Sequence, residues 1–254
     1  MNEIKRVLIL GGTGDAVELA TRVAEIPGVQ VITSLAGRTR QPTRPPENTP
    51  QITQRIGGFG GVSGLTVYLQ EQKIDVLIDA THPFAAQISF NGAAAAAALG
   101  IDHLMLIRPG WERTSGDRWI EVDSHTAAAD ILPEIAQRIF LTIGRQELAA
   151  WGHLQDLWFL MRMIEPPLPD AAVPPGKILL ERGPFSVDNE RSLLQQYQIG
   201  AIVSKNSGGN ATYAKIIAAR ELGIPVVMIQ RPVVPATDTV ADIESALLWL
   251  KHRL

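Results

Sequence analysis

The sequence predicts an α/β protein of two Rossmann-like domains whose parallel sheets face a central cleft. Short apolar runs bounded by glycine or proline alternate with helix-like stretches along the whole chain. Such runs are typical of parallel strands that helices cover on both faces. This alternation is interrupted at 108–117, where Pro109, Gly110 and Gly116 indicate a linker. A chain of 254 residues is long enough for two such domains.

The expected elements follow one another at regular intervals. In the first half, strands are predicted at 7–10, 29–34, 52–56, 76–79 and 103–107, and helices at 15–26, 62–72 and 84–99. In the second half, strands are predicted at 119–122, 139–143, 157–163, 178–181, 201–204 and 226–229, and helices at 126–135, 146–151, 186–196, 211–222 and 241–251. The proline-rich stretches 38–50 and 165–175 are expected to be loops. These elements give domains 1–110 and 111–236, and leave open the side on which 237–254 docks.

Composition and charge exclude several classes of protein. The absence of cysteine excludes disulfides and thiolate metal sites, and the five histidines show no paired metal-ligand spacing. A net charge of -3, with basic residues not interleaved with aromatic ones, disfavours nucleic acid. The longest apolar stretch, 92–100, is too short to span a bilayer, and no signal peptide precedes the first strand. We therefore expect a cytoplasmic protein, a monomer or homodimer, without a membrane, nucleic-acid or metal partner.

A glycine loop follows the first predicted strand. Gly11, Gly12, Thr13 and Gly14 lie between that strand and a helix, where backbone amides and the helix dipole favour a phosphate. The third glycine of the usual dinucleotide fingerprint is replaced by Val17. The loop predicts a nucleotide site, and the alternative is a tight turn without a ligand.

The end of the second predicted strand bears on which nucleotide binds there. Ser34 leads into Arg38 and Arg40, and no acidic residue is present to bond the ribose hydroxyls of NAD. Arg38 could instead hold a 2′-phosphate through two hydrogen bonds. This favours NADPH, with NADH still possible; the alternative is that both arginines are solvated loop charges.

Two further strand ends of the first half carry candidate cofactor residues. The cluster 57–61, with Gly58, lets the backbone pass close to a flat ligand. Thr81 and His82 follow the fourth strand, where a nicotinamide ring would arrive. His82 could donate a hydrogen bond, relay a proton or orient the ring. The alternative is a capping turn in which Thr81 or Asp79 begins the next helix.

Cations follow several strands of the second half. Arg145, Arg182, Lys205 and Arg231 each come shortly after a predicted strand, and Arg162 lies near the end of another. The carboxyl ends of parallel strands share one edge, so we expect these cations to cluster there and to bind a small polyanion. The alternative for each is an ordinary surface charge.

A second glycine-rich segment follows Lys205. Ser207 and Gly208 belong to the stretch 206–212, which opens a predicted helix and would form a second anion cradle.

Together these motifs resemble the precorrin-6A reductase family, which includes the cobalt-precorrin-6A reductases. The matching segments occur in the family's order from about residue 7 to about residue 232, and are 9–13, 34–38, 57–61, 79–85, 144–146, 181–185 and 204–209. One departure is Gly14-Asp15-Ala16, where many relatives have a glutamate and an arginine nearby.

The resemblance implies a reductase of the vitamin B12 (cobalamin) pathway. Hydride from NAD(P)H would pass to a C=C bond of the tetrapyrrole precorrin-6A, or its cobalt form, giving precorrin-6B, and a proton would reach the neighbouring carbon. The cations would hold the carboxylates of this polycarboxylate tetrapyrrole. His82, Lys205 or bulk water would supply the proton.

Two rival functions remain open from the sequence. A non-redox tetrapyrrole enzyme, such as a cyclising synthase, would also need a basic site but not the first glycine loop. A non-catalytic dinucleotide sensor would bind the cofactor, but it gives no reason for the cations of the second half.

Overall fold

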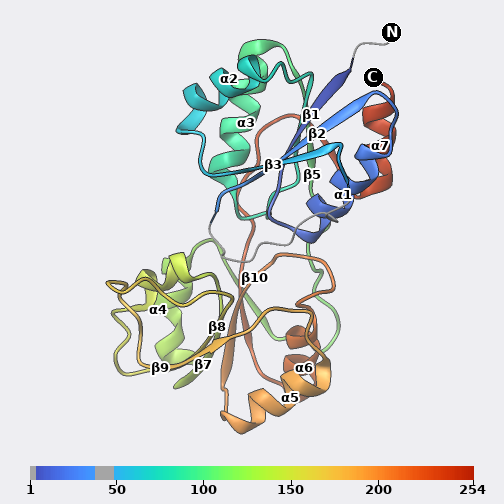
Figure 1. The fold of residues 1–254 in the computed structure, drawn as a ribbon. Helices are drawn as coiled ribbons and strands as arrows, with labels where there is room; N and C mark the ends of the chain where they lie inside the picture. Colours follow the sequence, from blue (N-terminus) through green and yellow to red (C-terminus); the bar gives the residue numbers. More distant parts are fainter. Residues whose placement is uncertain (1–3, 38–48) are drawn as a thin grey trace. The chain divides into compact units, whose positions relative to one another are not determined.

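The computed structural model describes residues 4–37 and 49–254, which form two compact units (Figure 1). Unit 1 comprises the described residues of 1–109 together with 232–254, and unit 2 comprises 110–231. Within the described residues, each unit contains one sheet of six strands, and every strand pair in both sheets is parallel. The predicted α/β fold with two parallel sheets is therefore confirmed.

Unit 1 is a three-layer unit with strand order β12-β5-β4-β1-β2-β3. Its strands are β1 (Lys5–Leu10), β2 (Val29–Leu35), β3 (Ile52–Ile56), β4 (Val76–Asp79), β5 (Asp102–Leu106) and β12 (Asp238–Val240). Its helices are α1 (Gly14–Ala24), α2 (Gly61–Glu71), α3 (Ala86–Leu99) and α7 (Ile243–Lys251). Successive side chains of a strand point to opposite faces. Val7 and Ile9 accordingly join the core under α1 and α7, whereas Leu8 and Leu10 join the core under α2 and α3 (Figure 1).

The end of the chain returns to unit 1. After unit 2, β12 pairs with β5, and the amide of Ile107 donates to Val240 O at 2.9 Å. Ala246 and Leu250 of α7 belong to the same buried core as α1. The helix predicted at 241–251 is present, and the structure answers the open question of its docking side. The strand β12 was not predicted.

Unit 2 has strand order β6-β11-β10-β7-β8-β9. Its strands are β6 (Trp119–Val122), β7 (Arg138–Thr142), β8 (Trp158–Met163), β9 (Gly176–Leu180), β10 (Ala201–Lys205) and β11 (Val226–Ile229). Its helices are α4 (His125–Ile135), the 3-10 helix η1 (Arg145–Trp151), α5 (Val187–Gln196) and α6 (Ala214–Leu222). Phe140 and Ile202 pack in one core with α5 and α6, while Phe159 meets Trp151 of η1. Figure 1 shows α4 on the other face of this sheet from α5 and α6.

The segment predicted as a linker is largely folded into unit 2. The carboxylate of Asp117, which is 7% exposed, accepts hydrogen bonds from the amide and hydroxyl of Thr114 and from the guanidinium of Arg220. The linker prediction therefore holds only around Pro109, because the Asp117 contacts order the residues after it. None of the helices formed by the described residues has the length and apolarity that crossing a membrane requires.

Candidate functional site

The first glycine loop has the backbone shape that a phosphate cradle needs. Gly12 has φ of 111° and no atom lies within 4 Å of a built Cβ, so the position requires glycine and its outer side is open. Thr13 is the N-cap of α1, and its hydroxyl also donates to Ala80 O at 2.7 Å. The amide of Gly11 donates to Ser34 O at 2.9 Å. A phosphate would therefore be held by the amides that follow Gly11, and the Thr13 hydroxyl fixes the loop to the end of β4.

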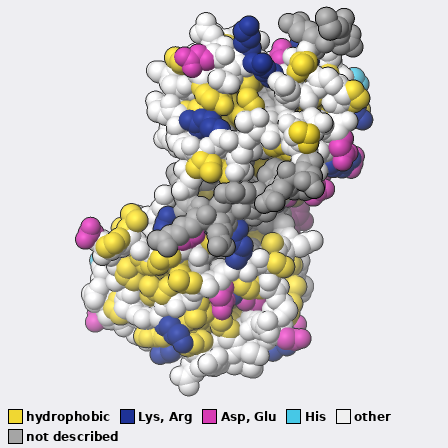
Figure 2. Space-filling view, viewed as in Figure 1, with side chains coloured by type: hydrophobic (Ala, Val, Ile, Leu, Met, Phe, Trp, Pro, Cys, Tyr) yellow, Lys and Arg dark blue, Asp and Glu magenta, His cyan; other side chains and the backbone are white. Residues whose placement is uncertain are grey.

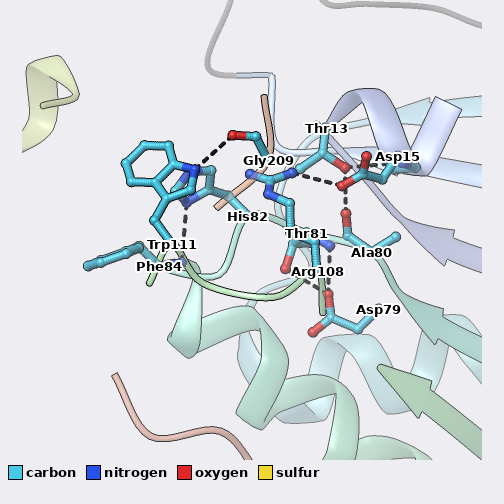
Figure 3. A network of polar contacts seen from close by, with 11 residues as sticks. Thr13, Asp15, Asp79, Ala80, Thr81, His82, Phe84, Arg108, Trp111 and Gly209 are labelled. Carbon is cyan, nitrogen blue, oxygen red and sulfur yellow. Dashed lines mark hydrogen bonds and ion pairs between the residues drawn. The ribbon is translucent and has the colours of Figure 1, made fainter. Parts of the chain in front are cut away.

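The turn after β4 is fixed by a buried carboxylate. Asp79, 1% exposed, accepts hydrogen bonds at Oδ1 from the Thr81 amide (2.9 Å) and hydroxyl (2.6 Å) (Figure 3). His82 Nδ1 accepts from the amide of Phe84 at 3.2 Å, which places the proton of the neutral ring on Nε2. The N-cap of α3 is Ala85, without a side-chain bond. Asp79 and Thr81 therefore stabilise the turn and do not cap the helix.

A buried histidine lies near this carboxylate, and sequence reasoning missed it. Burial lowers the pKa of His103, and the charge of Asp79 opposes that shift. Neither ring nitrogen of His103 nor Asp79 Oδ2 has a hydrogen-bond partner among the described residues. The only sequence signal is a histidine within an apolar strand.

Arg55 organises the second glycine cluster and was also missed. Its guanidinium donates to Gly57 O at 2.5 Å, to Gly58 O at 2.7 Å and to Ser34 Oγ at 3.3 Å. It also stacks on the ring of Phe59, 3.8 Å from the centroid. Arg55 thus joins the predicted cofactor residues Ser34 and Gly58. Arg38, the predicted 2′-phosphate residue, lies outside the described residues.

An ion pair spans the carboxyl edge of the sheet in unit 1. Arg108 Nη1 lies 2.7 Å from Oδ2 of Asp15, in the first turn of α1 (Figure 3). Arg108 follows β5, so its side chain crosses the end of β4 to reach α1. The sequence places each residue after a strand, but nothing in it pairs them.

The four predicted cations of unit 2 follow strands of one parallel sheet. Arg231, Lys205 and Arg145 come at or just after the ends of the neighbouring strands β11, β10 and β7. Arg182 follows the edge strand β9, which β8 separates from β7. All four therefore belong to the carboxyl edge of the sheet. On the face shown in Figure 2, the basic and acidic side chains of the described residues are interspersed with apolar ones.

Lys205 is paired with an acid at this edge. Its Nζ lies 2.5 Å from Glu147 Oε1 in η1, and its side chain is 12% exposed. His125, at the start of α4, is close enough for both charges to act on it. Burial lowers the pKa of His125, Lys205 lowers it further, and Glu147 opposes the shift. Glu147 and His125 were not predicted.

The segment after Lys205 is held by Trp111. The Trp111 amide donates to Asn206 Oδ1 at 2.7 Å, and its indole Nε1 donates to Gly209 O at 2.8 Å. Helix α6 begins at Ala214 instead of residue 211, so Ser207 and Gly208 precede its first turn by several residues. The stretch 206–212 therefore lies before the helix and does not form its first turn, in contrast to the prediction from the sequence. The left-handed φ of Gly208 (68°) and Gly209 (72°) interrupts the helical path.

Arg162 does not belong with the cations of the sheet edge. It is 7% exposed, and its guanidinium donates to both carboxylate oxygens of Glu190 in α5, at 2.6 and 2.7 Å. It also stacks on Phe185 at 3.7 Å. The prediction that Arg162 lies in a ligand site is wrong, because its charge is neutralised inside unit 2. Among the described residues, no group of three His, Cys, Asp or Glu side chains is arranged to hold a metal ion.

These sites define a two-unit α/β protein with a dinucleotide-type loop in one unit and a cationic sheet edge in the other. The profile of the family described as precorrin-6x reductase CbiJ/CobK matches residues 6–251. The chain belongs to this family, as its resemblance predicts, and is therefore an oxidoreductase.

Individual relatives are similar to this chain over almost their whole lengths. The chain is 49% identical to precorrin-6A reductase of Rhodococcus erythropolis, covering 96% of this chain and 97% of that one. It is 42% identical to precorrin-6A reductase of Rhodobacter capsulatus, covering 96% and 95%. The solved structure titled CobK precorrin-6A reductase matches with a TM-score of 0.89 and 41% identity, over 98% of this chain and 97% of that one. The synthase and sensor alternatives gain no support.

Proposed function

We propose that this protein reduces one C=C bond of precorrin-6A to give precorrin-6B, with NADPH as the hydride source. The observation that carries the proposal is the family match over residues 6–251, with relatives named precorrin-6A reductase that are more than 40% identical along almost their whole length. Those names specify the ring without cobalt, so the metal-free ring is the proposed substrate.

Unit 1 is the proposed cofactor domain. The open side of Gly12 and the amides up to Gly14 fit a pyrophosphate at the start of α1. Ser34 and Arg38 are assigned to the adenosine ribose and its 2′-phosphate, and Gly58 to a close backbone approach. Arg38 carries the preference for NADPH over NADH in this proposal.

Thr81 and His82 are assigned to the nicotinamide end of the cofactor. When bound, the cofactor supplies a hydride to one carbon of the substrate. The Asp79 contacts with Thr81 keep this turn rigid. Because Nδ1 of His82 already accepts from Phe84, the neutral ring can only donate through Nε2. This suits a residue that orients the ring or a carboxamide, and not one that delivers the proton.

The carboxyl edge of unit 2 is the proposed substrate site. Arg145, Arg182, Lys205 and Arg231 are assigned to the acetate and propionate side chains, because guanidinium and ammonium groups form strong charge-assisted hydrogen bonds with carboxylates. The segment with Ser207 and Gly208, which Trp111 holds, is assigned to backbone contacts with the same groups.

Lys205 is the proposed proton donor. Its ammonium group would pass a proton to the carbon next to the one that accepts hydride, so that hydride and proton together saturate the C=C bond. Glu147 Oε1 lies 2.5 Å from Nζ of Lys205 and orients this group in the absence of substrate.

Cofactor oxidation tests the proposal. Loss of reduced-nicotinamide absorbance is followed with precorrin-6A, with its cobalt form, and without a ring, using NADPH and NADH in turn. We expect oxidation only with a ring, faster with the metal-free form and with NADPH. Lys205→Met should lower kcat by at least about 100-fold, whereas Lys177→Met, at an exposed lysine of β9, should not change it. Absence of ring-dependent oxidation would refute the function.

Replacing a cation tests the division of roles between the units. Arg182→Ala should weaken ring binding by about 1.5–3 kcal/mol and leave NADPH affinity unchanged. A large loss of NADPH affinity would show that the roles are reversed.

A further inference from the structure

The ion pair between Asp15 and Arg108 lies at the place where the proposed cofactor phosphate would bind. Thr13 is the N-cap of α1, so Asp15 occupies the second position of the first turn. Amides of that turn are the donors that a phosphate uses. Asp15 brings a carboxylate, 41% exposed, to the same short stretch. An acid here stabilises the start of the helix, but it also repels an incoming phosphate.

Arg108 compensates for this charge. Its Nη1 is 2.7 Å from Asp15 Oδ2, and its side chain is 23% exposed, so it remains accessible. Its position is set by the fold, because the amide of the preceding residue, Ile107, donates a hydrogen bond to the carbonyl of Val240 in β12. The arginine is therefore carried on an ordered strand end and directed toward the loop (Figure 3).

We propose that Arg108 is a pyrophosphate-binding residue of the cofactor site, and that Asp15 competes with the cofactor for it. In the free protein the carboxylate holds the guanidinium beside the loop. When the dinucleotide binds, the guanidinium donates to a phosphate oxygen and its contact with Asp15 weakens. This inference rests on the proposed function, since it requires that unit 1 binds the dinucleotide.

The competition predicts opposite effects for the two partners. Arg108→Gln removes a charge-assisted hydrogen bond and leaves Asp15 uncompensated, so the Kd for NADPH should rise about 10- to 100-fold. Asp15→Asn keeps the shape of the side chain, removes the repulsion and removes the negative charge that attracts the arginine, so the Kd should fall about threefold to tenfold. If the pair only held the loop in place, both variants would weaken binding.

These dissociation constants are measured by titrating the cofactor into the protein and following the fluorescence of the reduced nicotinamide. The matched control is Arg22→Gln, which breaks the ion pair with Glu244 at the other end of α1 and should leave the Kd unchanged. The loss in Arg108→Gln should be the same for NADPH and NADH, because both contain the pyrophosphate. A loss confined to NADPH would assign Arg108 to the 2′-phosphate and overturn the proposal.

The sign of the Asp15→Asn effect is the decisive result. Weaker NADPH binding by this variant overturns the inference, and it does so even if Arg108→Gln fails to fold. If the wild-type protein binds neither NADPH nor NADH, the proposed function fails instead, so the two failures are distinguishable.

Discussion

Replacing Lys215 with methionine should make the stability of unit 2 less dependent on pH. Lys215 lies in the first turn of α6 and is 4% exposed. Its Nζ donates to Thr212 O at 2.8 Å and lies 4.8 Å from the ring centroid of Trp111. Burial, and then the charge of Arg162, lower its pKa from 10.5 to about 7, while Glu190 opposes the shift.

The sign of the pH dependence follows from this lowered pKa. Between pH 7 and 10.5 the unfolded chain binds a proton at Lys215 that the folded chain does not. The free energy of unfolding therefore rises with pH in this window, by up to about 1.4 kcal/mol per unit from this group. The destabilisation is fully present below pH 7 and is relieved as the pH approaches 10.5. The stability that Lys215→Met gains over the wild type should be largest at pH 7 and below, and should shrink by about 2 kcal/mol between pH 7 and pH 9.

Urea unfolding at pH 7, 8 and 9, followed by tryptophan fluorescence, measures this change. The signal reports mainly on unit 2, which contains four of the five tryptophans, namely Trp111, Trp119, Trp151 and Trp158. Lys177→Met is the matched control, because Lys177 is an exposed lysine of the same unit, and it should reproduce the wild-type pH profile. Parallel profiles for the wild type and Lys215→Met would refute the reasoning.

Three further predictions concern buried or crowded positions. Glu190→Gln removes the buried carboxylate that pairs with Arg162 and leaves only the more exposed Glu181, at 3.6 Å, so it should lower the free energy of unfolding by about 3–5 kcal/mol in urea titrations; a loss below about 1 kcal/mol would contradict this. The His103→Gln variant should lose less stability than the wild type as the pH falls below 6.5, because in the wild type the unfolded chain binds a proton at His103 more readily than the folded chain does. Identical dependence of the unfolding free energy on pH in the two proteins would argue against this. Gly64→Ala would put a Cβ 1.7 Å from Phe59 O. Calorimetry should therefore show a lower Tm, and cofactor titration should show weaker NADPH binding. An unchanged Tm would show that the backbone around Phe59 moves to accommodate the methyl group at little cost.

Most of the fold could be predicted because buried parallel strands are short apolar runs between helices. The strand β12 is the exception. Asp238–Val240 contains three residues, of which only Val240 is apolar, and no sequence period marks it. Its strand conformation comes from pairing with β5, more than 130 residues earlier, and tertiary context of this kind overrides local propensity. Because β12 pairs with β5 in unit 1, the helix that follows it, α7, also packs in unit 1.

The candidate site could be predicted in its positions but not in its pairings. Lys205 and Arg162 look alike in the sequence, since both lie at the end of an apolar run. Arg162 differs only because Glu190, 28 residues later in α5, comes to lie over it. Spacing along one strand cannot reveal a partner on a distant helix, so it cannot distinguish a buried ion pair from a charge at a sheet edge.

The acids beside the site cations have a consequence for binding. Asp15 holds Arg108 in unit 1, and Glu147 holds Lys205 in unit 2. A cation that a carboxylate already orients loses less side-chain freedom when a ligand arrives. Under the proposed function, a phosphate or carboxylate of the ligand then replaces one anion by another, and the affinity reflects the difference between two ion pairs. In a chain with a net charge of -3, this arrangement favours a ligand that brings several anionic groups, because one group alone gains little from the exchange.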